Sequence, residues 1–110
     1  MYGKDGQLVV CAAVKVGDII LVGARHYDNA MSNQFKAYKK AGLIPEGVKM
    51  HDGGGDFEGF IDQRCNFLSR EDAYLIAKEK GQIRYPIYER VLEWFKSEGR
   101  TPRIFSEHFY

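Results

Sequence analysis

Two apolar runs near the start of the chain predict a buried β-hairpin. Leu8–Val14 is rich in β-branched residues, and Ile19–Gly23 is a second run of the same kind. The residues between them, 16–18, include glycine and aspartate and have the composition of a turn. Because neither run alternates cleanly with polar residues, we expect both strands to be buried on both faces or nearly so.

Two of the following segments have the apolar spacing of amphipathic helices. One follows the N-cap residue Asp28 over residues 29–41, with apolar positions four and three apart at Met31, Phe35 and Tyr38. The other opens with Ser69 as N-cap and stops before Gly81. It has acids in its first turn and lysines in its last, which suits the helix dipole.

A loop and a second hairpin are predicted between these helices. Residues 43–56 contain Gly53-Gly54-Gly55, and ordering three successive glycines in a helix or strand costs much conformational entropy. So long a loop in a small domain is often a binding loop. Phe57–Ile61 and Asn66–Leu68 flank a polar turn and predict a strand–turn–strand unit.

A third helix and an aromatic tail complete the pattern. Pro86 at the first helical position and Gly99 just past the end predict this helix. The tail, residues 103–110, is too aromatic to be solvated and should pack on its own domain or on a second copy. The order of elements predicts an α+β fold: one small domain over residues 1–110, with an antiparallel sheet of two hairpins and about three helices.

Charge and composition exclude several classes of protein. The chain has 110 residues, with 16 Lys and Arg against 15 Asp and Glu, a net charge of +1. Proteins that bind DNA, RNA or a membrane surface through bulk charge are far more basic. The longest apolar run, Leu8–Val14, is too short to cross a bilayer. Two cysteines do not make a secreted disulfide framework, so we expect a cytoplasmic protein.

Catalytic and metal-binding signatures are weak. The three glycines resemble a phosphate-binding loop only superficially, because no predicted strand leads into them and no helix follows. His51, Asp52 and Asp56 lie close in sequence, but their spacing matches no standard ligand set, and a solvated polar loop is the favoured interpretation. Cys11 and Cys65 are interpreted as structural residues. We therefore expect no metal and no cofactor.

A first polar constellation follows the second apolar run. Here a buried strand runs out into Arg25 and His26 just before the N-cap Asp28. A guanidinium beside the free N–H groups of a helix start makes an anion site. An ion pair of Arg25 with Asp28 or Glu107 is about equally favoured.

A second constellation interleaves aromatic and polar residues over 57–70. Aromatic faces beside amides and carboxylates suit a purine, which needs stacking and edge-reading hydrogen bonds. On spacing alone, the favoured alternative is that the three phenylalanines are core residues and the polar groups decorate a turn. The residues concerned are Phe57, Phe60, Phe67, Asp62, Gln63, Arg64, Asn66 and Arg70.

Taken in order, the sequence resembles the first type of Thoeris anti-defence protein of bacteriophages. The resemblance spans most of the chain and rests on the whole pattern; the third helix and the glycine loop carry less of it. The chain departs from the family pattern at Arg64-Cys65 and His108-Phe109, which bears on turn geometry and ligand preference. The matching segments are Gly23–Asp28, Gly59–Gln63, Asn66–Ala73, Gly81-Gln82 and Phe105–Tyr110.

This resemblance implies a sponge and not an enzyme. Members of the family bind the cyclic ADP-ribose isomers made by bacterial TIR-domain proteins, without cleaving them, and so keep the downstream effector off. Some also take up the cyclic trinucleotides of CBASS defence. They form homodimers or hexamers with ligand pockets at subunit interfaces. The resemblance thus implies action in the cytoplasm of the infected host.

Candidate site residues are carried over from the resemblance onto this chain. Phe57 or Phe60 is expected to stack on the base. Polar recognition is assigned to Asp62, Gln63 and Asn66. The phosphate contacts are expected to come from Arg25 and Arg84.

Two other classes of function stay open from the sequence. An enzyme that degrades a cyclic nucleotide would need a base or metal near the phosphates, for which His26, or His51 with Asp52, are the candidates. A small interaction protein would instead dock a partner through its aromatic tail and have no small-molecule site.

Overall fold

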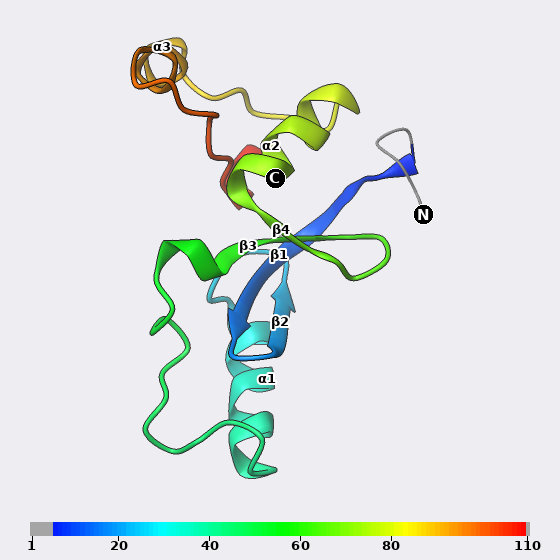
Figure 1. Ribbon diagram of the computed structural model, residues 1–110. Helices are drawn as coiled ribbons and strands as arrows, with labels where there is room; N and C mark the ends of the chain where they lie inside the picture. Colours follow the sequence, from blue (N-terminus) through cyan, green and yellow to red (C-terminus); the bar gives the residue numbers. More distant parts are fainter. Residues whose placement is uncertain (1–5, 110) are drawn as a thin grey trace.

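A four-stranded antiparallel sheet with helices packed around it forms the protein, as seen in a computed structural model that describes residues 6–109 (Figure 1). The strand order is β2-β1-β3-β4. This confirms the predicted α+β class and both hairpins. The elements are β1 (Val9–Val16), β2 (Ile19–Gly23), α1 (Asn29–Lys40), β3 (Glu58–Asp62), β4 (Phe67–Ser69), α2 (Arg70–Glu79) and α3 (Glu89–Ser97), with short 3-10 turns at Gly55–Phe57 and Ser106–His108.

β1 is the central strand because it pairs with β2 on one side and β3 on the other. Ala12 and Val14 belong to the main core, while Ala13, between them, is equally buried on the opposite face. Residues 12–14 of β1 therefore confirm the expectation of burial on both faces, whereas Val10, near the start of the strand, is 49% exposed. β2 does not: it is an edge strand, and only Leu21 in it is buried.

The helix starts follow their local signals. Asp28 caps α1 by accepting the backbone N–H of Met31 at 3.0 Å, and Met31 is the buried residue of that helix. Ser69 caps α2 in the same way, accepting the N–H of Asp72 at 3.1 Å. Gly81 follows α2 with φ +67°, the left-handed conformation that glycine adopts without cost.

The third helix begins three residues later than Pro86, the predicted start. α3 starts at Glu89 because the preceding segment pairs with the C-terminal tail: the N–H groups of Arg84 and Tyr85 both donate to the carbonyl oxygen of His108, at 3.0 and 2.9 Å. Ile87 is buried in the core, which keeps this segment extended. The predicted end is confirmed, since Gly99 follows with φ +66°.

The aromatic tail packs on its own domain. Ile104 is completely buried, and the ring of Phe109 lies 5.3 Å from that of Phe60, between centroids. Ile104 and Phe109 of the tail thus pack on the core of their own chain, whereas Phe105 is 41% exposed and Tyr110 lies outside the described residues.

Two glutamine side chains bond to the main chain of strand residues. Gln34 of α1 accepts the N–H of Val22 at 2.9 Å and donates to its carbonyl oxygen at 2.6 Å. Gln82 likewise accepts the N–H of Val9 at 3.0 Å and donates to its carbonyl oxygen at 2.8 Å. Each amide satisfies a donor and an acceptor of the strand.

Within residues 6–109, no helix has the length and apolar character to cross a membrane.

Gly59 is the position where the sheet tolerates no side chain. A Cβ there would lie 2.0 Å from the carbonyl oxygen of Leu68 on β4. We expect Gly59→Ala to lower the free energy of unfolding in urea by about 3 kcal/mol, because the β3–β4 pair must separate. Gly47→Ala is the matched control, since nothing lies within 4 Å of its added Cβ. Equal stability of the two variants would contradict this packing.

Candidate functional site

The sequence-predicted site residues of the second constellation lie at two ends of β3. Phe57 directly precedes the strand, whereas Gln63 and Asn66 are in the turn that follows it. β3 spans five residues, and at about 3.3 Å per residue its two ends are about 13 Å apart. A single chain therefore does not place the stacking and polar candidates around one pocket.

Two of the predicted site residues are structural in this chain. Phe60 is completely buried, with its ring 5.1 Å from that of His26, between centroids, so it offers no face to a ligand. Asp62 is 1% exposed, and its carboxylate accepts the backbone N–H groups of Arg64 and Asn66, both at 2.9 Å. In the single chain both side chains are used by the fold, one as a core ring and the other as a carboxylate that fixes a turn, and their roles in ligand binding stay predictions.

The other polar candidates remain at the surface. Gln63 is exposed, although its amide bonds to the N–H of Leu8 at 2.8 Å and to the carbonyl oxygen of Gly6. Asn66 and Arg25 are exposed as well. Arg84 is also exposed, and its guanidinium lies 5.6 Å from the ring centroid of Tyr85.

Phe57 borders a hollow of about 290 Å³ between the β1–β2 turn and the long loop. Its side chain is 40% exposed, and the ring packs on the main chain of Gly53, where an added Cβ would approach it to 2.6 Å. A residue of the glycine run thus provides the main-chain surface against which the ring of Phe57 packs. We call this feature the Phe57 hollow; it is lined by Lys15, Val16, Gly17, Val48, Lys49, Met50, Asp52, Gly53 and Phe57.

A charge cluster around the buried Arg70, which the sequence did not reveal, links this region to the tail. Arg70 is 4% exposed; its Nη2 donates to Oε1 of Glu58 at 3.2 Å, and its Nη1 donates to the carbonyl oxygen of Ile104 at 2.9 Å. The hydroxyl of Tyr27 donates to Oε2 of Glu58 at 2.6 Å. The ring of Phe105 lies 4.2 Å from the guanidinium carbon. We call these residues the Arg70 cluster: Tyr27, Glu58, Arg70 and Phe105.

The electrostatics of the Arg70 cluster follow from burial and pairing. Burial works to raise the pKa of Glu58, but hydrogen bonds from Tyr27 and Arg70 outweigh it and hold that pKa below its usual value. Burial, together with the hydrogen bond to Glu58, raises the pKa of Tyr27. The cluster is therefore a carboxylate held ionised between a phenol and a guanidinium.

His26, a candidate base in the enzyme alternative, is engaged in the fold. Its Nε2 lies 2.6 Å from the carbonyl oxygen of Gly59, so this nitrogen carries the proton and donates. Burial, and then the charge of Arg70, lowers the pKa of His26. In the part of the chain that the structure describes, no three His, Cys, Asp or Glu side chains are grouped to hold a metal ion.

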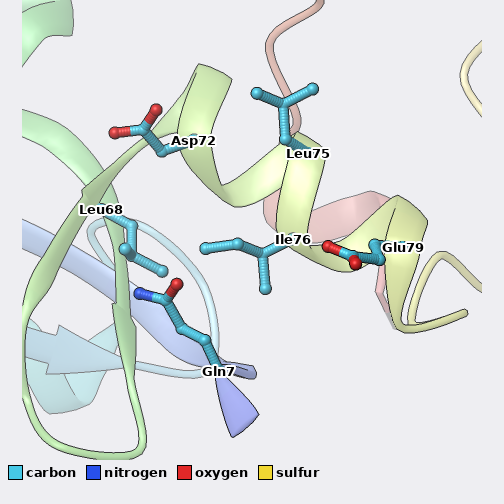
Figure 2. Close-up of a pocket in the computed structure, with 6 residues that line it drawn as sticks. All are labelled: Gln7, Leu68, Asp72, Leu75, Ile76 and Glu79. Atoms are coloured by element: carbon cyan, nitrogen blue, oxygen red, sulfur yellow. The ribbon is translucent and has the colours of Figure 1, made fainter. Parts of the chain in front are cut away.

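A second hollow, of about 380 Å³, lies between α2 and the start of β1 (Figure 2). Leu68 and Ile76 form its apolar lining, with Leu75 at the α2 rim. Its charged lining residues, Asp72 and Glu79, are both acidic and both come from α2. Carboxylates repel phosphates, so of the two hollows the Phe57 hollow suits an anionic ligand better.

Comparisons with known proteins give one match. The family described as "Phage T4 y16D protein" matches residues 8–110, nearly the whole chain. No curated protein matches, and no solved structure does.

Protonation of His26 should weaken the fold. The pKa of His26 in the folded chain is below its ordinary value of about 6.5. The unfolded chain therefore takes up the proton first as the pH falls. The stabilisation is complete above about pH 6.5 and is lost as the pH drops from there through the folded pKa. We expect wild type to lose more free energy of unfolding than His26→Gln between about pH 7.5 and pH 5.5 in urea titrations. Parallel losses in the two proteins would contradict this.

Proposed function

The chain belongs to the phage T4 y16D protein family, and from this premise we propose that it binds and sequesters cyclic ADP-ribose isomers. In this proposal the isomers are the signals made by bacterial TIR-domain proteins. Their capture blocks Thoeris immunity in the cytoplasm of the infected cell. Cyclic trinucleotides of CBASS defence are a second class of ligand for the same protein.

The exposed ring of Phe57 is the observation that carries the proposal. A large aromatic side chain that is 40% exposed and seated against main chain presents a fixed face at the edge of a hollow. Stacking of a base on such a face is worth about 1–3 kcal/mol. Its seat on Gly53 orients the ring before a ligand arrives, which reduces the entropy lost on binding.

A complete pocket in this proposal takes residues from two copies of the chain. Asn66 and Gln63 lie at the far end of β3 from Phe57, so a homodimer, or a hexamer built from dimers, is needed to bring them to one ligand. The side chain of Asn66, which is exposed and whose Nδ2 donates to Oδ2 of Asp62 at 3.1 Å, then reads the ligand that stacks on the other copy's ring. Arg25 and Arg84 are both exposed, and in this proposal they lie at the same kind of interface.

Sequestration without cleavage is favoured over enzymatic degradation by the state of the candidate bases. Nε2 of His26 already donates to Gly59. The carboxylate of Asp52, beside His51, accepts the N–H of Lys49 at 2.8 Å. Both side chains thus have partners within the fold.

Calorimetric titration with a panel of cyclic ADP-ribose isomers tests the proposal. We expect wild type to bind at least one isomer, and chromatography after denaturation should return that isomer intact. Phe57→Ala should weaken binding about tenfold or more, since the stacking surface is lost. Tyr88→Ala is the matched control, because it removes a ring that is 77% exposed elsewhere on the molecule. Absence of binding by wild type, or recovery of a cleaved product, refutes the proposal.

Mixing two binding-deficient variants, one weakened and one blocked, tests whether the pocket is shared between chains. We expect Asn66→Trp to abolish uptake by itself, because the bulky ring fills the partner's pocket. Unfolded and refolded together, Phe57→Ala and Asn66→Trp chains form mixed dimers in which one of the two pockets is intact. Titration should therefore recover part of the binding, up to about a quarter of the wild-type sites for random pairing. No recovery in mixtures shown by native mass spectrometry to contain mixed dimers would contradict a shared pocket.

A further inference from the structure

Two lysines line the Phe57 hollow, and the stacking role proposed for Phe57 does not involve either of them. Lys15 is the second-last residue of β1, and Lys49 lies in the long loop, so two separate segments bring them to one cavity. Nothing in the sequence connects the two lysines, because 33 residues separate their positions. Both lysines therefore line the same hollow, and each carries an ammonium group at the end of a long, flexible side chain.

Neither ammonium group is paired with a carboxylate among residues 6–109. The ion pairs in that range are Arg70 with Glu58 and Arg103 with Glu71. The Nζ of Lys15 lies 5.6 Å from the ring centroid of Phe67. An ammonium held over an aromatic face remains positively charged and can still donate to an anion.

The acidic residue of the hollow is used by the loop itself. Oδ2 of Asp52 accepts the N–H of Lys49 at 2.8 Å, and the N–H of Asp52 donates to the carbonyl oxygen of Lys49 at 3.2 Å. This reciprocal pair closes the turn. The charged lining residues are thus two cations and one turn-forming carboxylate, which leaves the hollow with a net positive charge.

The rest of the lining is apolar and anchored. Val16 is buried, and Val48 and Met50 pack against the main core. A volume of about 290 Å³ lies just below the range of small-molecule sites, which begins at about 300 Å³. Such a hollow takes a planar group and its attached phosphates, and not the whole of a large ligand.

We propose that Lys15 and Lys49 bind the diphosphate of an adenine nucleotide whose base stacks on Phe57. Lysine is a mobile point charge, suited to a diphosphate that presents oxygens in several directions. These lysines take the role that the sequence analysis gave to Arg25 and Arg84. This inference rests on the proposed function for the stacking role of Phe57.

The positions of Lys15 and Lys49 in the fold favour them over Arg84 as the residues that contact the phosphates. Arg84 lies on the segment between α2 and α3, and its backbone is tied to His108. Figure 1 shows this segment beside α2 and α3, above the sheet, whereas the long loop descends beside α1. Within one chain, the cations that share a cavity with Phe57 are the two lysines.

Titration with ADP at fixed ionic strength tests the lysines directly. Lys15→Gln and Lys49→Gln should each weaken ADP binding about tenfold, the value of one charge-assisted hydrogen bond. Lys36→Gln, an equal loss of charge on the exposed face of α1, should leave ADP binding unchanged. Adenosine lacks the phosphates, so its weaker binding should be the same in wild type and in both variants. Equal melting temperatures confirm that the variants are folded.

Three results would overturn the inference: no ADP binding by wild type, unchanged ADP binding in both lysine variants, or an equal loss in Lys36→Gln. Arg25→Gln and Arg84→Gln are the further comparison, and a loss confined to them places the phosphates elsewhere. Failure of the proposed function gives a different result. If ADP binds in a lysine-dependent way and no cyclic ADP-ribose isomer binds, the lysine site stands and the sponge does not. If the isomers bind through Phe57 with no effect of either lysine, the sponge stands and the lysine site does not.

Discussion

Burial of the Arg70 guanidinium is the constraint on which the arrangement of this molecule depends. A buried cation is tolerated only where its charge and its donors are met. Glu58 meets the charge, the carbonyl oxygen of Ile104 accepts a second donor, and the ring of Phe105 covers the guanidinium. Because Arg70 opens α2, β3 and the tail are fixed relative to that helix by one side chain.

The same cluster controls the segment that joins β2 to α1. Tyr27 has φ 60°, an uncommon conformation for a residue with a side chain, and its hydroxyl is bonded to Glu58. Its N–H also lies 3.2 Å from the sulfur of Met31. Arg25 and His26 are carried on this segment, so the exit from β2 has a defined path from the sheet to the helix.

Local signals predicted most of the fold, and tertiary contacts account for what they missed. The caps Asp28 and Ser69 act on neighbouring N–H groups, so their effect is readable from a few residues. The start of α3 was predicted wrongly because residues 84 and 85 bond to His108, more than twenty positions away. The Arg70 cluster was missed for the same reason, since its four residues come from four separate segments.

The candidate site was harder to predict than the fold. Phe57 and Phe60 have the same side chain and lie three positions apart, yet Phe60 is in the core and Phe57 is not. The difference is set by where β3 begins and by the seat on Gly53, and neither can be read from spacing. The lysines of the Phe57 hollow come together only when the β1–β2 turn meets the long loop.

The glutamine contacts on Val22 and Val9 bear on how copies of this chain can meet. An unpaired strand edge is a template on which a second chain can add a strand, and from there grow an aggregate. The amide of Gln34 occupies both main-chain groups of Val22 on the edge strand β2, and Gln82 does the same to Val9 beyond the end of β2. Each glutamine amide makes the two main-chain hydrogen bonds that one residue of an added neighbouring strand would make. Continuous sheet extension along this border is thereby disfavoured, and self-recognition is left to side chains and loops.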